Sequence, residues 1–329
     1  MAALDLPLAE ARRISDLWFP QASLILRAEN SLFRVHGDLL GARSSVFRDM
    51  ADIAFEQSPD SGEDTVDGRN VIRLYDSAAE VQVFLRAIFD SSFFMPPPAP
   101  VDYTTVIGVM RLAHKYDVQY LFRRAISHLE LLYPPSFSAF LEARDHEHKH
   151  HVRFTGDGIV DLLAIQAALE VRALWILPTA YYYLATAPDF MEVTVPDSNE
   201  QQRCLDARSK FPPATISMHR FFRTLPCSIC DSAVSKCEQA IVLAQGELER
   251  WRETEDPRLL EPLSPASILD CLPENIWTRL CSPCHVAGEQ EFVRAQEEFW
   301  EELPSVFGLP SRAELAKLRR HFMDDSICD

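Results

Sequence analysis

The sequence lacks a hydrophobic run long enough to cross a membrane. Its nearest approach, residues 173–187 ("ALWILPTAYYYLATA"), is short and is interrupted by Pro178, whereas a spanning helix needs about 20 consecutive apolar residues. The first residues, "MAALDLPLAEARRISDLWF", also lack the apolar core of a signal peptide. These absences predict an intracellular protein of the cytoplasm, the nucleus or both, with no membrane partner.

Positive charge is in short supply. Lysine and arginine number 32 against 49 aspartate and glutamate residues, so the formal net charge is −17. We find no basic stripe that offsets this balance locally. Because such an acidic surface repels phosphate backbones, the composition predicts no nucleic-acid partner.

A hydrolase-like nucleophile motif is also absent. The stretch "SLFRVHGDLLGARSSVFRDM" holds His36, Asp38, Ser44 and Ser45 close together, but nothing in it forms a Gly-x-Ser-x-Gly elbow. His36 follows a strand-like alternation and is expected to be a hydrogen-bonded structural residue, and Ser44 is expected to cap a helix. We therefore predict no catalytic residue and no enzymatic activity.

What is present suits a folded protein with protein partners. The 329 residues are 47% hydrophobic and 10% aromatic, enough for a packed interior in two domains or in one domain with a long extension. In a reducing compartment, the eight cysteines are expected to be free thiols or metal ligands rather than disulfides.

Hydrophobic periodicity predicts a mixed first part of the chain, with its strands and helices in alternation. In order, the expected elements are a β-hairpin at 23–28 and 31–36, short helices to about Gly41 and from Ser44, a strand at 71–76, a helix at 78–90, and two helices within 102–133 that meet at Asp117–Val118.

The rest of the chain reads as mainly helical. Helices are expected within 157–185, 237–253, 289–303 and 312–323, the last opening with a capping-box spacing of Ser311 and Glu314. Prolines at 188, 196, 212 and 213 predict a loop-rich segment between the helices of 157–185 and 237–253. Four histidines within "DHEHKHH" (145–151) are interpreted as a solvated linker rather than a metal site.

The first part resembles a BTB/POZ domain. The matching text is "SLILRAENSLFRVHGDLLGARSSVFRDM", "VIRLYDSAAEVQVFLRAIFD" and "LAHKYDVQYLFRRAISHL", in that order. The closest similarity is to the large set of BTB proteins from mushroom-forming fungi. The resemblance implies an α+β fold, with short strands and a surrounding helical bundle, followed by a mainly α-helical C-terminal region. The expected divisions are 1–21 (N-terminal extension), 22–133 (BTB/POZ domain), 134–187 (helical extension), 188–220 (loop-rich linker) and 221–329 (helical region with the cysteine pairs).

One departure from the family concerns its dimer. Many animal BTB homodimers resemble each other in a buried acidic residue thirteen positions before the histidine and a basic residue just after it. Here those positions hold Ser23 and Gly37. Because both charged residues are missing, no buried charge is left without its partner. We expect a monomer or a different dimer.

Two Cys-x-x-Cys pairs form the strongest chemical signal. Cys227 and Cys230 make up the first pair, and Cys281 and Cys284 the second. Such turns aim two thiolates at one ion, and two turns complete a closed Cys₄ zinc site. The pairs predict a structural zinc ion, with no other cofactor.

The ligand set leaves alternatives open. His285 or Cys237 could replace one of the four ligands, and the separation of the two pairs exceeds that of compact zinc motifs. Four free thiols, buried as small apolar groups, are the alternative to a metal.

Together these features predict a protein–protein interaction module. Many BTB proteins are similar in bridging a cullin scaffold to a substrate, so the resemblance implies a substrate adaptor of a cullin-type ubiquitin ligase. The partner is then a cullin or another BTB chain, bound through the helices around Ser44–Ala54 and the loop 91–103. An apolar patch is expected at Phe89, Phe93 and Phe94. A transcription-associated or scaffolding assembly protein is the alternative, and a zinc-dependent enzyme is less favoured.

Overall fold

The chain folds into two units. The computed structural model describes residues 7–56, 65–144, 152–153, 160–187, 190–191, 197–220, 226–230, 235–264 and 279–324. One unit comprises Met1–Leu132 and His146–Arg172, and the other comprises Tyr133–Asp145 and Ala173–Asp329. This division passes through the segment 134–187, because α7 (Val160–Glu170) belongs to the first unit and α8 (Leu177–Thr186) to the second.

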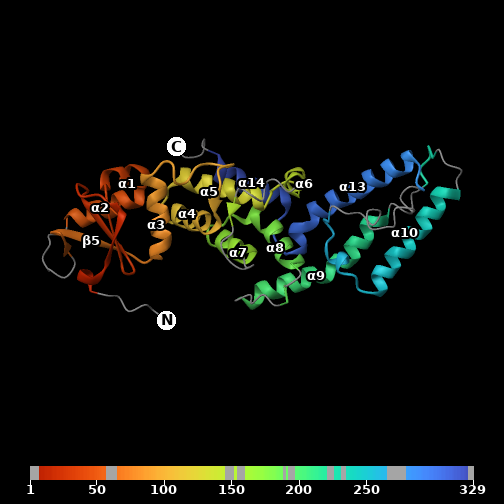
Figure 1. Ribbon diagram of the computed structural model, residues 1–329, viewed down its shortest axis with the longest axis horizontal. Coiled ribbons are helices and arrows are strands. Elements are labelled where there is room, and N and C mark those ends of the chain that lie inside the picture. Colours follow the sequence, from red (N-terminus) through yellow and green to blue (C-terminus); the bar gives the residue numbers. More distant parts are fainter. Residues whose placement is uncertain are drawn as a thin grey trace. The chain divides into compact units, whose positions relative to one another are not determined.

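The first unit is built on a five-stranded sheet with α1, α2 and α3 around it (Figure 1). The strand order is β1-β3-β2-β5-β4, with β5 parallel to β2 and β1 parallel to β3. The strands are β1 (Arg12–Trp18), β2 (Leu24–Ala28), β3 (Ser31–Val35), β4 (Thr65–Val66) and β5 (Arg69–Leu74).

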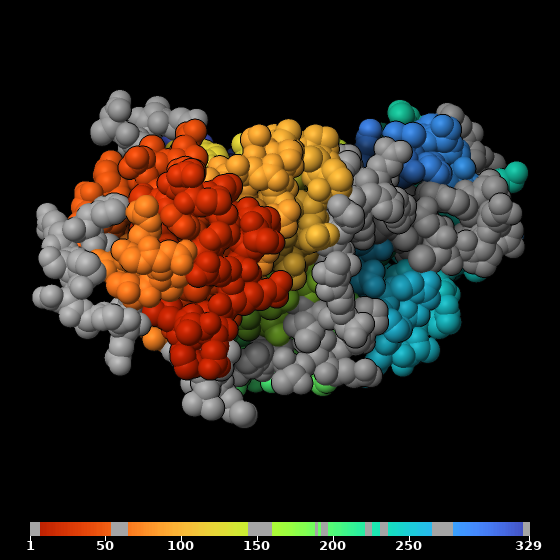
Figure 2. All heavy atoms as spheres, turned by 60° about the vertical axis from the view of Figure 1, so that its left-hand side comes forward, coloured from red at the N-terminus to blue at the C-terminus, as the bar shows by residue number. Residues whose placement is uncertain are grey.

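The predicted hairpin is confirmed as antiparallel β2 and β3. Its turn places Glu29 at φ 48°, the left-handed conformation that a tight hairpin requires. Figure 2 views the molecule from the side of these N-terminal segments, drawn in red. All five residues of β2 are buried, which makes this strand the centre of the sheet.

The first strand was not predicted, since residues 1–21 were expected to be an extension outside the domain. In β1 the buried residues are Ile14 and Leu17, three positions apart, because the pairing with β3 is irregular between Arg13 and Trp18. This spacing hides the two-residue alternation by which a strand is recognised in a sequence.

The helices of the first unit follow the predicted order. They are α1 (Gly37–Arg43), α2 (Ser45–Glu56), α3 (Ala78–Phe89), α4 (Tyr103–Lys115), α5 (Gln119–Leu132) and α7, with a short pair of strands, β6 (Val101–Asp102) and β7 (Val152–Arg153). The junction of α4 and α5 falls at Asp117, whose φ is 53°. Phe47 stacks on Tyr116 at 4.4 Å between ring centres, which joins α2 to the end of α4.

The predicted apolar patch beside the proline loop is wrong. Phe94 is buried, and the guanidinium of Arg86 covers the ring of Phe93 at 4.2 Å. Phe89 packs beside Phe19, with 5.6 Å between ring centres. The phenylalanines therefore contribute to packing rather than to a free apolar surface.

The regular elements among the described residues of the second unit are all helices. Its elements are α6 (Phe137–Arg144), η3 (Leu174–Ile176), α8, α9 (Ser198–Met218), α10 (Ser235–Glu253), η5 (Pro257–Leu260), α13 (Ser282–Val306) and α14 (Arg312–Met323). Its core includes Phe140 and Trp300, whose ring centres lie 4.9 Å apart, and the buried Trp175. The capping box of Ser311 and Glu314 is confirmed at the start of α14.

The loop-rich linker expected over 188–220 is wrong for residues 198–218, which form α9. The Asp197 side chain caps this helix by accepting a hydrogen bond from the Asn199 amide. Pro212 and Pro213 lie inside it, and each removes one helical hydrogen bond. The helix persists because one side of it is buried at three- and four-residue intervals, at Cys204, Ala207, Phe211, Thr215 and Met218.

Among the described residues, no helix combines the length and the apolar character that crossing a membrane requires. The histidine-rich segment 145–151 lies outside the described residues.

Candidate functional site

The serine and histidine of the first unit do not form a nucleophile and base. The Ser44 hydroxyl oxygen accepts a hydrogen bond from the Phe47 amide at 3.0 Å, so Ser44 caps α2 as predicted. The same hydroxyl donates to the carbonyl oxygen of Tyr116. His36 is exposed, against the expectation of a hydrogen-bonded structural residue, and its ring packs beside Phe19 at 5.6 Å.

The two Cys-x-x-Cys pairs meet within the second unit. The sulfur of Cys227 lies 3.5 Å from that of Cys284, and the sulfur of Cys230 lies 3.6 Å from that of Cys281. Each contact joins one cysteine of the first pair to one of the second. The segment between the pairs therefore returns the chain to the same place, as the zinc prediction requires.

A fifth cysteine joins them. The sulfur of Cys237 lies 3.7 Å from that of Cys230. The sulfur atoms of Cys230, Cys237, Cys281 and Cys284 all lie within 4.8 Å of one another and could hold a metal ion. This group contains Cys237, which the sequence offered only as a substitute, and leaves out Cys227.

Local structure explains how each thiol is placed. Cys227 and Cys230 lie at the ends of a turn in which the Cys230 amide donates to the Cys227 carbonyl oxygen at 3.1 Å. Cys237 lies in the first turn of α10. Cys281 is the N-cap of α13, and Cys284 lies in the first turn of that helix. Helix starts favour thiolates, because their free amides and their dipole stabilise negative charge.

Backbone amides already point at two of the sulfur atoms. The Cys227 amide donates to Cys284 Sγ at 3.4 Å, and the Cys281 amide donates to Cys237 Sγ at 3.3 Å. Burial raises the pKa of the Cys284 thiol above its ordinary value, and the neighbouring thiols add to this effect. A bound cation would reverse this shift by stabilising the thiolates.

The spacing of the sulfur atoms suits zinc. With a Zn–S bond of about 2.3 Å, the edges of a regular ZnS₄ tetrahedron are about 3.8 Å long. The contacts of 3.6 and 3.7 Å that Cys230 makes with Cys281 and Cys237 are close to that length. A disulfide would bring two sulfurs to about 2.05 Å, and these cysteines are not disulfide-bonded. His285, the other possible substitute, faces Glu289 at 3.4 Å and is not part of the group.

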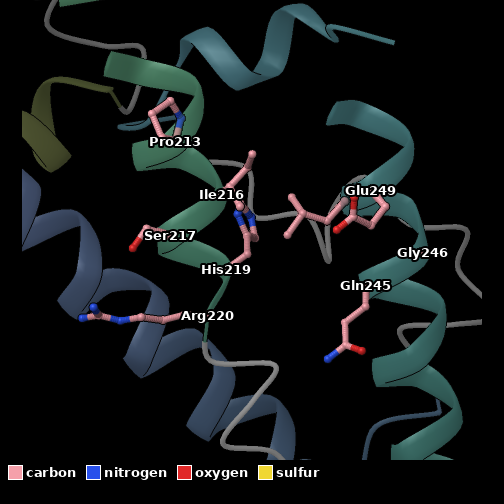
Figure 3. A pocket seen from close by; sticks show the side chains of 9 residues that line it. Pro213, Ile216, Ser217, His219, Arg220, Gln245, Gly246 and Glu249 are labelled. Atoms are coloured by element: carbon pink, nitrogen blue, oxygen red, sulfur yellow. The ribbon is translucent and has the colours of Figure 1, made fainter. Parts of the chain in front are cut away.

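A hollow of about 650 Å³ lies between α9 and α10, and Figure 3 shows the side chains that line it. His219 is buried there, and its Nδ1 donates to the Thr215 carbonyl oxygen at 2.8 Å. Burial lowers the pKa of His219 to about 4, so the ring is neutral at physiological pH. Arg220 points away toward α13, where it pairs with Glu298 at 2.7 Å. We interpret His219 as a packing residue of the second unit.

Comparison of the chain with protein-family models, with curated proteins and with solved structures finds no match in any of the three.

Proposed function

We propose that this chain is a protein-interaction protein whose first unit acts as a BTB/POZ-type module. The proposal is supported by the order of elements in that unit, which is a hairpin, two short helices, a strand, a helix and a helix pair. The resemblance of the sequence to a BTB/POZ domain rests on the same order of elements. A chain of this kind works in the cytoplasm or the nucleus, where its cysteines stay reduced.

The specific role we propose is that of a substrate adaptor for a cullin-type ubiquitin ligase. The observation that carries it is the exposed apolar side chain of Ile53 on α2, where the partner is expected, together with that of Leu39 on the neighbouring α1. Leu39 on α1 is 42% exposed, and Ile53 on α2 is 58% exposed. Large apolar side chains on neighbouring helices are typical of a protein contact.

The test is affinity purification of the tagged full-length chain from its native cells, with mass spectrometry of the proteins that accompany it. We expect a cullin to co-purify with the parent chain and with the Tyr75→Asp variant. It should not co-purify with the Ile53→Asp variant. Tyr75 is the matched control, because its side chain belongs to the same unit, is 86% exposed and lies after β5, outside the two helices.

The outcomes separate the alternatives. Recovery of a cullin with Ile53→Asp would place the contact elsewhere than on α1 and α2. One reproducible partner other than a cullin would instead favour a scaffolding or transcription-associated assembly protein. Both variants are expected to fold, since each changes an exposed side chain.

We also propose that the cysteine group holds one structural zinc ion. The thiols of Cys230, Cys237, Cys281 and Cys284 come from a turn, from α10 and from the start of α13, so one ion would tie these three segments together. Four thiolates fill a tetrahedral zinc ion and leave no position for a reacting water. The site therefore supports a structural role better than the alternative of a zinc-dependent enzyme.

A further inference from the structure

The last helix of the second unit carries a local excess of positive charge in an otherwise acidic chain. Helix α14 holds Arg312, Lys317, Arg319 and Arg320 against the carboxylate of Glu314, and Asp324 follows as its C-cap. The carboxylate of Glu314 accepts hydrogen bonds from the amide and the hydroxyl of Ser311 in the capping box. This helix is a short exception to the acidic balance of the chain.

Three of these cations line one cavity. It has a volume of about 310 Å³, and its walls include the side chains of Arg312, Arg319 and Arg320. Trp175 and Leu315 contribute apolar surface to it, and Ser136 lies at its edge. The cavity is therefore lined by three arginines together with the apolar residues Trp175 and Leu315. Clustered arginines of this kind are the usual means of recognising phosphate groups in proteins.

Arg312 is held in place from two sides. Its guanidinium lies 4.4 Å above the ring of Trp300, and its Nη2 donates to the Trp300 carbonyl oxygen at 2.6 Å. Its Nε is buried and has no hydrogen-bond partner among the described residues. Burial lowers the pKa of Arg312 to about 10, while Glu301 acts in the opposite direction. A buried guanidinium donor that lacks a hydrogen-bond partner is costly, and an anionic ligand would remove that cost.

The start of α6 adds to the positive potential. Ser136 precedes this helix, and its hydroxyl oxygen accepts a hydrogen bond from the Ala139 amide at 3.3 Å. The N-terminal end of a helix carries a partial positive charge, which favours an anion nearby.

We propose that this cavity binds a phosphate monoester group, with the attached organic part resting on the apolar wall. A phosphate offers several oxygen atoms to guanidinium groups in the paired geometry that these groups favour, whereas a carboxylate offers two. The net charge of −17 disfavours anion binding over the chain as a whole, so we expect phosphate to bind at this cavity. The site lies in the second unit, and its existence does not depend on cullin binding by the first.

The test is isothermal titration calorimetry on the full-length chain at constant ionic strength. The probes are inorganic phosphate, O-phosphoserine, a short peptide that contains phosphoserine, and acetate as the carboxylate control. We expect saturable binding of the phosphate probes and none of acetate. Because each guanidinium makes charge-assisted hydrogen bonds, Arg319→Ala and Arg320→Ala should each weaken binding about ten-fold.

Lys317→Ala is the matched control. Lys317 is an exposed cation of the same helix, but it does not line the cavity. We expect its affinity for phosphate to remain within about two-fold of that of the parent chain, since a change in net charge alone has little effect at constant ionic strength. Equal losses in all three variants, or no saturable binding of any phosphate probe, would overturn the proposal.

The peptide arm identifies the source of the phosphate group. Tighter binding of the phosphoserine peptide than of O-phosphoserine would indicate a phosphorylated protein segment as the ligand. Equal affinity would indicate a small phosphorylated molecule. Both results support a phosphate-monoester site, and thermal unfolding of each variant checks that the second unit remains folded.

Discussion

The hydroxyl of Ser44 donates a hydrogen bond to the carbonyl oxygen of Tyr116 across 2.5 Å. Ser44 is buried at the start of α2, and Tyr116 follows α4 by one position, so the bond joins segments 72 residues apart. The same oxygen accepts from the Phe47 amide. One side chain therefore caps a helix and ties that helix to a second element.

Replacement of Ser44 by alanine should destabilise the first unit by about 2 kcal/mol, because it removes a helix cap and leaves a buried carbonyl oxygen without this donor. Urea unfolding followed by circular dichroism measures the change. Ser45→Ala is the control, since the Ser45 hydroxyl bonds to Asp117 at the exposed surface and its loss should cost less than about 0.5 kcal/mol. Equal effects of the two variants would contradict the assigned role of Ser44.

The proposed zinc ligands can be separated by two serine substitutions. Cys237→Ser should lower the zinc content of the purified chain, because Cys237 belongs to the group that encloses the ion. Cys227→Ser should retain about one zinc per chain. Atomic emission spectrometry of both variants provides the measurement. If Cys227→Ser lost its zinc and Cys237→Ser retained it, the ligands would instead be the four cysteines of the two Cys-x-x-Cys pairs.

Burial of His219 should make the stability of the second unit sensitive to pH. The unfolded chain takes up a proton below about pH 6.5, whereas folded His219 does so only near its pKa of about 4. Its contribution is therefore fully present above pH 6.5 and is lost as the pH falls toward 4, by about 3 kcal/mol in all.

His219→Asn isolates this contribution. Its side-chain amide can replace Nδ1 as the donor to the Thr215 carbonyl oxygen but does not titrate. The difference in unfolding free energy between the parent and the variant should therefore favour the parent most at pH 7 and shrink toward pH 4. Urea titrations at several pH values measure it, and a difference that does not vary with pH would refute the prediction.

The chain should be a monomer in dilute solution. Strand β1 pairs with β3 of the same chain, and Leu17 of β1 is buried. Gly37 stands where many BTB homodimers carry a cation, and a Cβ added to it would lie 3.5 Å from the Ser23 hydroxyl oxygen. We expect a mass of about 37.4 kDa by light scattering. A stable dimer that is lost on substitution of Leu17 or Trp18 would show an exchanged strand instead.

Local patterns were sufficient for most elements. Two short apolar-rich runs separated by Glu29-Asn30 predicted the β2–β3 hairpin, and the three- and four-residue spacing of apolar residues predicted α3. They failed at β1, whose buried residues are three apart, and at α9, whose prolines indicated a loop. In both cases packing against other parts of the chain outweighs a local signal.

The sequence by itself determined that the two cysteine pairs could meet at one ion. Each pair lies in a Cys-x-x-Cys turn of four residues, and such a turn is a local structure. Only the tertiary structure decided that Cys237 completes the group and that Cys227 lies outside it. It also decided that the arginines of α14 share a cavity with Trp175, although Trp175 is far away in the sequence. Spacing along the chain specifies turns and helix faces, whereas the meeting of distant side chains depends on how the helices pack.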